Sequence, residues 1–321
     1  MEKKPYVIGL DLGGTNSVFG IVDANGNVVE SVSLKTAGHG PLPHKYVEDC
    51  VEALRPLIDK VGGIGKIQGM GIGAPNGNYY TGCIEFAPNL PWKMESVPLA
   101  ELFSKALGIP VAMTNDANAA AMGEMAYGVA KGMKNFIMIT LGTGVGSGIV
   151  VDGKVVYGSD GLAGELGHVT VETRDGRQCG CGRKGCLETY CSATGVARTA
   201  RQLLTDTDRP SLLRDLPLDQ LESKDVSIAA GKGDALAKEI MDFTGRLLGF
   251  ACANFACFNS PEAFVFFGGL TKAGDLIMNP IKEGYDQNIL KCYAGKAKFF
   301  VSELDDAKAA VLGASALGWE A

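Results

Sequence analysis

The sequence predicts an α/β protein built from two similar domains, and repeated glycine turns support this prediction. Residues 6–16 read as an apolar strand that ends in a glycine turn, and the chain then resumes as a second strand. Residues 136–146 repeat the plan and continue into another apolar strand at 149–151. A repeated strand–turn–strand unit indicates two related domains. Helical stretches alternate with the strands, which is typical of α/β layers with covered sheets.

The remaining elements follow from periodicity and turn signals. We expect helices at residues 46–61, 117–127 and 235–258, and a third strand–glycine element at 263–271. Residues 306–317 also read as a helix, which we expect to cross back onto the first domain. The predicted domains are residues 1–115 plus 306–321, forming a small α/β domain, and 116–305, forming a larger one with a zinc-binding loop.

Composition narrows the class of protein. A chain of 321 residues with net charge −6 and no run of Lys or Arg argues against a nucleic-acid surface. The nine cysteines are odd in number and scattered outside one cluster, which favours a reducing compartment over a disulfide framework. Polar residues and a proline interrupt the longest apolar tract, at 247–267, so it does not read as a membrane span. With no cleavable apolar stretch near residue 1, we expect a soluble cytoplasmic protein.

One short stretch carries four residues of the types that bind zinc: His168, Cys179, Cys181 and Cys186. Three thiolates and one imidazole form a closed tetrahedral zinc site, and the interleaved glycines allow the tight turns that this needs. The alternative is four unligated residues in a reduced protein. The compact spacing favours zinc. Glu165 and Glu188 flank the cluster, so we expect the zinc to shape a pocket as well as to staple a loop.

The glycine turns indicate phosphate binding. Turns of the type Gly13-Gly14-Thr15 and Gly142-Thr143-Gly144 present backbone N–H groups with no side chain in the way, and their threonines add hydroxyl donors. Asp11 precedes the first loop, where it could hold Mg²⁺ directly or through water. A single loop of this kind could equally be a tight hairpin, because such a hairpin also needs glycine. Two loops in a repeated plan, with Gly268-Gly269 as a third, favour phosphate.

Two common nucleotide motifs do not apply. The chain has no Gly-x4-Gly-Lys-Ser/Thr sequence, so it is not a Walker-type ATPase. Residues 69–74 match a loose dinucleotide fingerprint, but Pro75 follows where a helix must begin and the glycines fall inside a strand. This match therefore does not indicate a dinucleotide site.

Asn115 and Asp116 stand at the start of the helix predicted at 117–127. Helix capping alone would explain one of them. Asp116 is also a candidate general base that accepts a proton from a hydroxyl attacking a γ-phosphoryl group. A helix N-terminus favours the ionised carboxylate, so the two roles are compatible and we expect both.

These motifs together resemble the ROK family of bacterial sugar kinases and repressors, in the family's order over nearly the whole chain. The motifs are Asp11-Leu-Gly-Gly-Thr15, Asn115-Asp-Ala-Asn118, Gly142-Thr-Gly144, Glu165-Leu-Gly-His168 and the cysteine cluster running into Glu188. The resemblance implies the actin/hexokinase-type (ribonuclease H-like) fold, two α/β domains with a cleft between them that closes on sugar and ATP.

The resemblance also implies roles for individual residues. The implied sugar contacts are Asn115, Asp116, Glu165, His168 and Glu188, with Asp116 as the base. The implied nucleotide contacts are Asp11, Gly13, Gly14, Thr15, Asn16, Thr143 and Gly144 around the phosphates, and Gly268 and Gly269 near the adenosine. His168 would both bind zinc and touch the sugar, so the zinc would orient a substrate contact. The implied cofactors are ATP, Mg²⁺ and Zn²⁺.

The residue types favour a neutral hexose. None of the five sugar positions is Arg or Lys, which a phosphorylated or carboxylated substrate would require. Residues 87–92 resemble the family's Asn-Leu-Pro-x-Trp sugar loop, with Asn89 an additional sugar contact. A proline-rigid connection with a buried Trp92 explains this segment equally well. Because that loop is common among the family's glucokinases, glucose and its 6-hydroxyl are the first expectation. Asn76, where many members carry glycine, and Ser147, within a glycine-rich stretch, are departures that leave the hexose open.

Several alternatives remain open. An N-acetylmannosamine or N-acetylglucosamine kinase, or a fructokinase, would use the same residues. ROK repressors carry a helix-turn-helix before the kinase-like part, for which the first strand leaves no room. A sugar sensor without catalysis would be expected to lose Asp11 or Asp116, and both are present. The family pattern and a long amphipathic helix favour a homodimer, although an apolar helical face is more often core. No nucleic-acid or membrane partner is expected.

Overall fold

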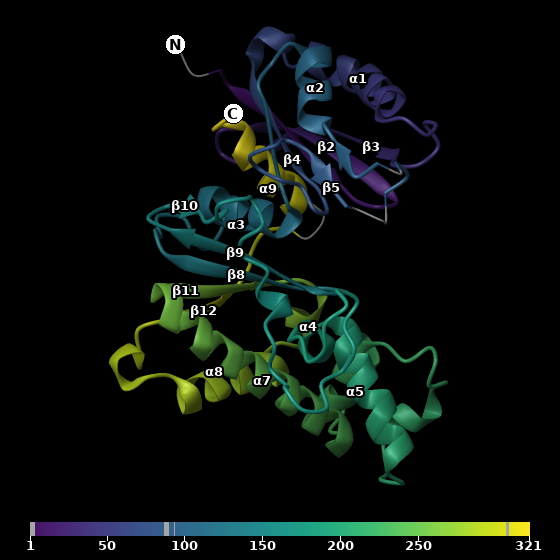
Figure 1. Ribbon diagram of the computed structural model, residues 1–321, viewed down its shortest axis with the longest axis vertical. Helices are drawn as coiled ribbons and strands as arrows, with labels where there is room; N and C mark the ends of the chain where they lie inside the picture. The colour runs from purple at the N-terminus through teal and green to yellow at the C-terminus, as the bar shows by residue number, and fades with distance from the viewer. Residues whose placement is uncertain (1–3, 87–89, 93, 306–307) are drawn as a thin grey trace. The chain divides into compact units, whose positions relative to one another are not determined.

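The computed structural model describes residues 4–86, 90–92, 94–305 and 308–321 (Figure 1). Strands and helices alternate along it, which confirms the predicted α/β class. Backbone contacts divide the chain into two compact units, each made of segments that are distant in sequence. Unit 1 comprises Met1–Met133, Gly148–Gly164 and Glu303–Ala321, and unit 2 comprises Lys134–Ser147 and Glu165–Ser302.

The first sheet has five strands in the order β3-β2-β1-β4-β7. Its strands are β1 Tyr6–Leu12, β2 Asn16–Asp23, β3 Val28–Lys35, β4 Ile67–Gly73 and β7 Val111–Thr114. β1, β2 and β3 form an antiparallel meander, whereas β4 and β7 join β1 in parallel. The helices of this part are α1 Pro43–Lys60, α2 Leu99–Leu107 and α3 Asp116–Tyr127, and a short pair, β5 Ile84–Glu85 and β6 Ser96–Val97, lies apart.

The second sheet repeats this plan, with the order β10-β9-β8-β11-β12. Its strands are β8 Phe136–Leu141, β9 Val145–Val151, β10 Lys154–Val155, β11 Ala263–Phe267 and β12 Lys298–Val301. As in the first sheet, the last two strands run parallel to the central one. The helices that follow are α4 Glu188–Cys191, α5 Ala193–Asp206, α6 Ser223–Gly231, α7 Ala235–Asn259 and α8 Asp275–Asn288. The matching strand orders confirm the repeat predicted from the glycine turns.

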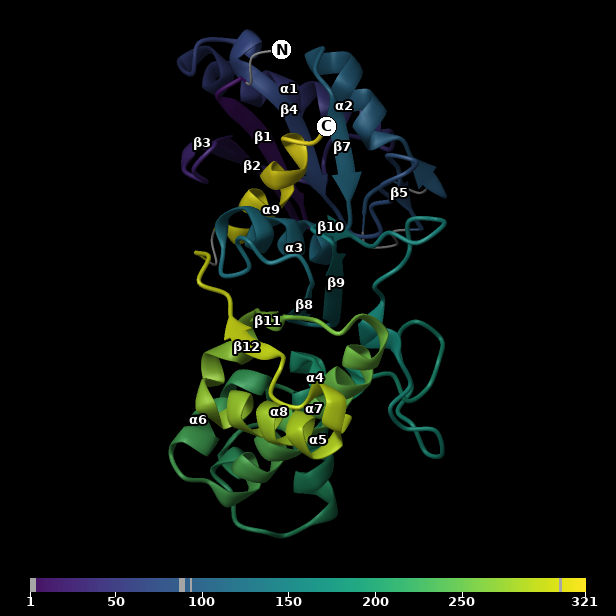
Figure 2. The same ribbon diagram turned by 90° about the vertical axis from the view of Figure 1, so that its left-hand side faces the viewer.

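The last helix, α9 (Ala309–Gly318), packs on the first sheet beside α3, as predicted (Figures 1 and 2). The glycines of β4 make this packing possible. A Cβ added to Gly71 would lie 1.9 Å from the carbonyl oxygen of Ala314, and one added to Gly69 would lie 2.7 Å from that of Gly318. The glycines of residues 69–73 therefore let a helix lie close against a strand, which explains the false dinucleotide fingerprint physically.

Each sheet buries apolar side chains beneath helices. In unit 1, Leu10 and Phe19 of the sheet share a core with Tyr46 and Leu54 of α1 and with Phe103 of α2. The three helices predicted from periodicity are present as α1, α3 and α7, each within a few residues of its expected bounds. No helix among the described residues combines the length and the apolar character needed to cross a bilayer.

The compact units do not end at the predicted domain boundaries. Residues 116–133 and 148–164, which the sequence analysis assigned to the larger domain, belong to unit 1 by their contacts. The reason is packing, because α3 lies against α9: a Cβ on Gly123 would meet Gly313 Cα at 2.8 Å. The order of the elements along the chain does not show that the last helix, α9, packs against α3.

Candidate active site

In unit 1, the first glycine loop connects β1 to β2 and leaves its tip open to solvent. Gly14, Thr15 and Asn16 are exposed, and Gly13 is half-buried. The loop closes through a hydrogen bond from Gly13 N to the carbonyl oxygen of Asn16, 3.0 Å long. The side-chain oxygen of Asn16 accepts a hydrogen bond from Lys35 Nζ at 3.0 Å. The exposed tip of this glycine turn is compatible with the predicted phosphate contact, which stays a prediction.

Asp11 lies on β1 at the entrance to this loop. Burial, and secondly the negative charge of Asp116, raise the pKa of its carboxyl to about 6. Two carboxylates that disfavour each other's charge would be stabilised together by a divalent cation. Asp11 therefore fits the predicted Mg²⁺ role, through its oxygen donor and its electrostatic surroundings.

The predicted caps occupy the start of α3. Asn115 is the N-cap, and its Oδ1 accepts a hydrogen bond from Asn118 N at 2.7 Å. Asp116 is the first helical residue and is exposed, and its Oδ1 accepts a hydrogen bond from Ala117 N at 2.8 Å. Asn115 therefore performs the capping, and Asp116 keeps an exposed carboxylate available for other chemistry.

In unit 2, the second glycine loop connects β8 to β9 and meets the carboxylate of Glu188. Glu188 Oε2 accepts a hydrogen bond from Val145 N at 2.9 Å. A Cβ on Gly144 would lie 2.3 Å from the same oxygen, so only glycine leaves room for this carboxylate. Gly144, a predicted phosphate contact, and Glu188, a predicted sugar contact, are thus direct neighbours.

A pocket of about 650 Å³ lies beside this loop in unit 2. Thr143 and Gly269, both predicted nucleotide contacts, line it. Gly268 brings the ends of β11 and β8 together, because a Cβ there would meet the carbonyl oxygen of Leu141 at 2.5 Å. The pocket is also lined by residues that the sequence analysis missed, on α6, α8 and the segment before α8: Ser223, Lys224, Ser227, Ile228, Lys272 and Leu276. Only the Glu222/Asp225 capping box at the start of α6 offered a sequence signal for that helix.

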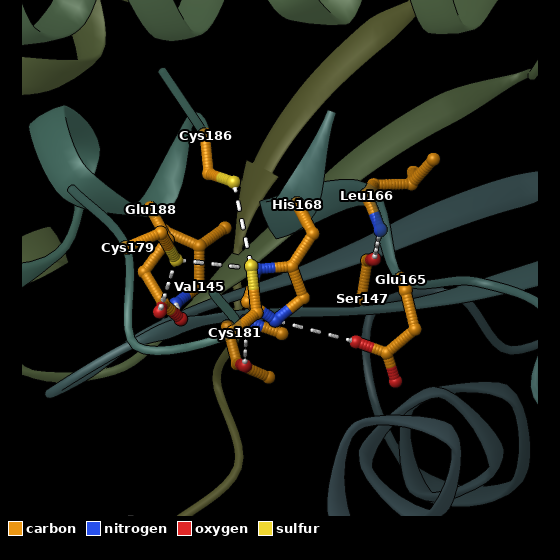
Figure 3. Close-up of polar contacts among 11 residues, drawn as sticks. Val145, Ser147, Glu165, Leu166, His168, Cys179, Cys181, Cys186 and Glu188 are labelled. Atoms are coloured by element: carbon orange, nitrogen blue, oxygen red, sulfur yellow. Dashed lines mark hydrogen bonds and ion pairs between the residues drawn. The ribbon is translucent and has the colours of Figure 1, made fainter. Parts of the chain in front are cut away.

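The four predicted zinc ligands converge in unit 2 (Figure 3). One ligand atom from each residue lies within 4.8 Å of the others. The sulfurs of Cys181 and Cys186 are 3.7 Å apart, and the sulfur of Cys179 lies 3.7 Å from Nδ1 of His168. A tetrahedral zinc site with ordinary bond lengths separates two sulfurs by about 3.8 Å and a sulfur from a nitrogen by about 3.6 Å. The residues therefore fit a zinc ion.

His168 uses its two ring nitrogens on different sides (Figure 3). Nδ1 faces Cys179, whereas Nε2 lies 3.9 Å from Oε2 of Glu165. Both Glu165 and His168 belong to the segment around a short 3-10 turn, Leu166–His168. Ser147 holds that turn, because its Oγ accepts a hydrogen bond from Leu166 N at 3.1 Å. Ser147, noted in the sequence only as an interruption, thus has a local structural role.

Two other sequence observations concern the first unit. Asn76 adopts a positive φ of 53°, a conformation that favours glycine, and its side chain donates to the carbonyl oxygen of Phe86 at 3.0 Å. Asn76 is thus accommodated where many relatives were expected to carry glycine. Trp92 is buried against Tyr46, with ring centroids 5.0 Å apart. Asn89, the remaining predicted sugar contact, lies outside the described residues.

Comparison with known proteins identifies the family. The model of the ROK family matches residues 7–320. The chain belongs to the ROK family. A glucokinase of Halalkalibacterium halodurans is 37% identical over 318 residues, covering 98% of this chain and 94% of that protein. A xylose repressor of Caldicellulosiruptor bescii is 29% identical over 282 residues, covering 85% of this chain and 70% of that protein.

A solved ROK structure is similar to this chain along nearly its whole length. It is a ROK family glucokinase from Streptomyces griseus in complex with glucose and AMPPNP, 33% identical, covering 98% of this chain and 100% of that one with a TM-score of 0.78. The fold of this ROK chain is accordingly the actin/hexokinase type that the resemblance implied. The glucokinase of Halalkalibacterium halodurans exceeds the xylose repressor of Caldicellulosiruptor bescii in identity and in the share of both chains covered.

Proposed function

We propose that this ROK protein is an ATP-dependent glucokinase that transfers the γ-phosphoryl group of ATP to the 6-hydroxyl of glucose. The observation that carries the proposal is the similarity to glucokinases along 98% of the chain, combined with an exposed carboxylate at Asp116. Gly14, Thr15 and Asn16 of the first glycine loop are exposed, and Thr143 and Gly269 line a pocket, which supports the proposal.

Asp116 is the proposed general base. Its carboxylate accepts the proton of the sugar's 6-hydroxyl while that oxygen bonds to the γ-phosphorus, and the bond from the γ-phosphorus to the bridging oxygen breaks to release ADP. Asp116 is the first residue of α3 and is exposed, so its carboxylate is accessible to a sugar hydroxyl.

The proposed sugar contacts hydrogen-bond neutral hydroxyls. Glu165 and Glu188 accept hydrogen bonds, Asn115 accepts and donates, and His168 offers Nε2 on the side away from Cys179. Asn89 stays a proposed contact from the sequence. The absence of Arg and Lys from this set favours an uncharged hexose over a sugar acid or sugar phosphate.

The proposed nucleotide contacts fall on both glycine loops. Asp11, Gly13, Gly14, Thr15 and Asn16 of unit 1 and Thr143 and Gly144 of unit 2 would surround the phosphates, with Gly268 and Gly269 near the adenosine. The pocket lined by Thr143 and Gly269 is large enough for a nucleoside. Asp11 would hold Mg²⁺, which neutralises phosphate charge when bound.

The zinc ion is proposed to have an orienting role. His168, Cys179, Cys181 and Cys186 would hold it, and zinc in such a closed site fixes its ligands without performing Lewis-acid chemistry. Binding through Nδ1 leaves Nε2 of His168 free to contact the sugar. The zinc ion would then determine the orientation of the His168 ring.

A coupled ADP-release assay with Mg-ATP tests the proposal. We expect turnover with glucose to exceed that with mannose, fructose, N-acetylglucosamine and N-acetylmannosamine. A preference for an acetylated sugar or for fructose would keep the mechanism and replace the substrate. Sugar binding without turnover on any of the five would support a sensor and overturn the kinase proposal.

A homodimer and a cytoplasmic location are further proposals. Phe243 and Phe250, seven residues apart on α7, are both exposed, as apolar residues on a partner-binding helix face would be. All nine cysteines are free, which suits a reducing compartment. Light scattering at several protein concentrations would test the dimer, and a constant monomer mass would exclude it.

A further inference from the structure

Three buried hydroxyl groups in unit 1 form a continuous chain that ends on the first glycine loop. Tyr46 OH of α1 donates to Ser17 Oγ of β2 at 2.7 Å. Ser17 Oγ lies 2.9 Å from Thr36 Oγ1, and Thr36 Oγ1 donates to the carbonyl oxygen of Gly13 at 2.7 Å. Tyr46, Ser17 and Thr36 are each 0% exposed, so water does not compete for these hydrogen bonds.

Chemistry fixes the direction of this chain. The Gly13 carbonyl only accepts, so Thr36 must give it the single hydrogen of its hydroxyl. Thr36 therefore accepts from Ser17, and Ser17 in turn accepts from Tyr46. Hydrogen bonds aligned in one direction in a low-dielectric interior polarise and strengthen one another.

Thr36 also holds the loop through its backbone. Thr36 N donates to the carbonyl oxygen of Thr15 at 3.0 Å. Thr36 thus donates hydrogen bonds to two carbonyl oxygens of the loop, those of Gly13 and Thr15. Glycine turns have little conformational preference of their own, so a loop that aims N–H groups at a phosphate needs such support.

The far end of the chain is rigid. Tyr46 packs edge-on against Trp92, with ring centroids 5.0 Å apart, and against Phe103 at 6.3 Å. Its hydroxyl is fixed by the fold, because an aromatic side chain locked in this way cannot change rotamer without opening the core. The position of the glycine loop is therefore tied to α1.

We infer that Thr36 is a positioning residue for the nucleotide-binding loop 13–16, and that Ser17 and Tyr46 orient its hydroxyl. The inference rests on the proposed kinase function. Thr36 does not touch substrate in this scheme. It acts by keeping the Gly13 carbonyl turned inward, so that the loop's N–H groups stay directed outward.

Steady-state kinetics of Thr36→Val test the inference, because valine has nearly the shape of threonine and carries a methyl group in place of the hydroxyl. We expect kcat/KM for Mg-ATP to fall about tenfold, the equivalent of one lost hydrogen bond, while KM for glucose changes by less than about twofold. Thr36→Ser retains the hydroxyl and should restore most of the loss. Unchanged kcat/KM for Mg-ATP in Thr36→Val would overturn the inference.

Ile58→Ala serves as a control for simple destabilisation. Ile58 lies in α1, is 5% exposed, and belongs to the same core without touching the hydroxyl chain. We expect it to lower Tm at least as much as Thr36→Val does, with both KM values unchanged. If Ile58→Ala also lost affinity for Mg-ATP selectively, Thr36 would have only a structural role.

The order of the chain is tested with Tyr46→Phe. Alone, this variant should reduce kcat/KM for Mg-ATP less than Thr36→Val does, since Thr36 can still donate to Gly13. Combined with Thr36→Val it should add nothing further, because the connection to the loop is already cut. Fully additive losses would contradict a single directed chain.

Calorimetric binding of AMPPNP separates this inference from the proposed function. If the wild type binds AMPPNP but phosphorylates no sugar, the kinase proposal fails. The affinity of Thr36→Val for AMPPNP still tests the inference in that case. If the wild type turns over glucose and Thr36→Val binds AMPPNP normally, the inference fails and the kinase stands. A wild type that binds no nucleotide overturns both.

Discussion

Burial and the nearby charge of Asp116 raise the pKa of Asp11 to about 6, so β1 and α3 bring two carboxylates into one electrostatic neighbourhood. These residues are distant in sequence and belong to the same unit. The proposed Mg²⁺ ligand, Asp11, therefore lies near the proposed general base, Asp116.

Asp116→Asn is expected to fold normally and to lose turnover by a factor of about a thousand, because an amide cannot accept the sugar's proton. The substitution keeps an oxygen for the hydrogen bond from Ala117 N. Asp234→Asn makes the same chemical change at the N-cap of α7 and should leave kcat unchanged. Steady-state kinetics with glucose and thermal unfolding measure the two effects. Near-normal turnover in Asp116→Asn would remove Asp116 from the role of base.

Cys181→Ser is expected to lower zinc content and to raise KM for glucose at least about tenfold, because the ring of His168 loses its anchor. Metal analysis of the purified protein and sugar kinetics provide the two readouts. Cys292→Ser changes an exposed cysteine outside the cluster and should affect neither. Loss of zinc with unchanged glucose kinetics would show that the metal is remote from the sugar.

His39 is expected to stabilise the protein at low pH. Its Nδ1 lies 2.6 Å from Asp49 Oδ2, and its Nε2 lies 2.8 Å from the carbonyl oxygen of Lys35. Both partners only accept, so the doubly protonated ring suits the site best. The hydrogen bond to Asp49, then that to Lys35, raise the pKa of His39 above its usual range.

The sign of the pH effect follows from this shift. A pKa that is higher in the folded state contributes stability that is fully present below the unfolded value, about 6.5, and is lost as pH rises through the folded value. His39→Gln should therefore lower Tm more at about pH 5.5 than at about pH 9. Thermal unfolding of both proteins at these pH values gives the comparison. An equal Tm difference at both would show that His39 stays neutral.

Asn78→Ala is expected to destabilise unit 1 by about 2–3 kcal/mol, because it removes a buried and fully bonded amide. The Asn78 side chain is 2% exposed, donates to the carbonyl oxygen of Asp160 at 2.7 Å, and accepts from Tyr80 N at 2.9 Å. Asn27→Ala removes an exposed amide and should cost less than about 0.5 kcal/mol. Urea unfolding measures both, and equal losses would mean that Asn78 does not clamp the segment that contains Asp160.

The glycines show where prediction from sequence reaches its limit. The glycine turns after β1 and β8 were predictable, because a turn between two apolar strands is a local pattern. The role of Gly71 was not, since it depends on Ala314 of α9, a residue far away in the chain. Lys224 and Ile228 line the pocket beside Thr143 for a similar reason, because the fold of unit 2 brings α6 to that loop.

The α/β class, the repeated strand–turn plan, the main helices and the Cys3His cluster were predictable from local patterns, because each depends on spacing along a short stretch of chain. Other features become visible only in the folded chain: α3 belongs with unit 1, Nδ1 of His168 faces Cys179, and Tyr46, Ser17 and Thr36 support Gly13. Such contacts join residues that are distant in sequence, and periodicity carries no information on which distant residues the packed core brings together.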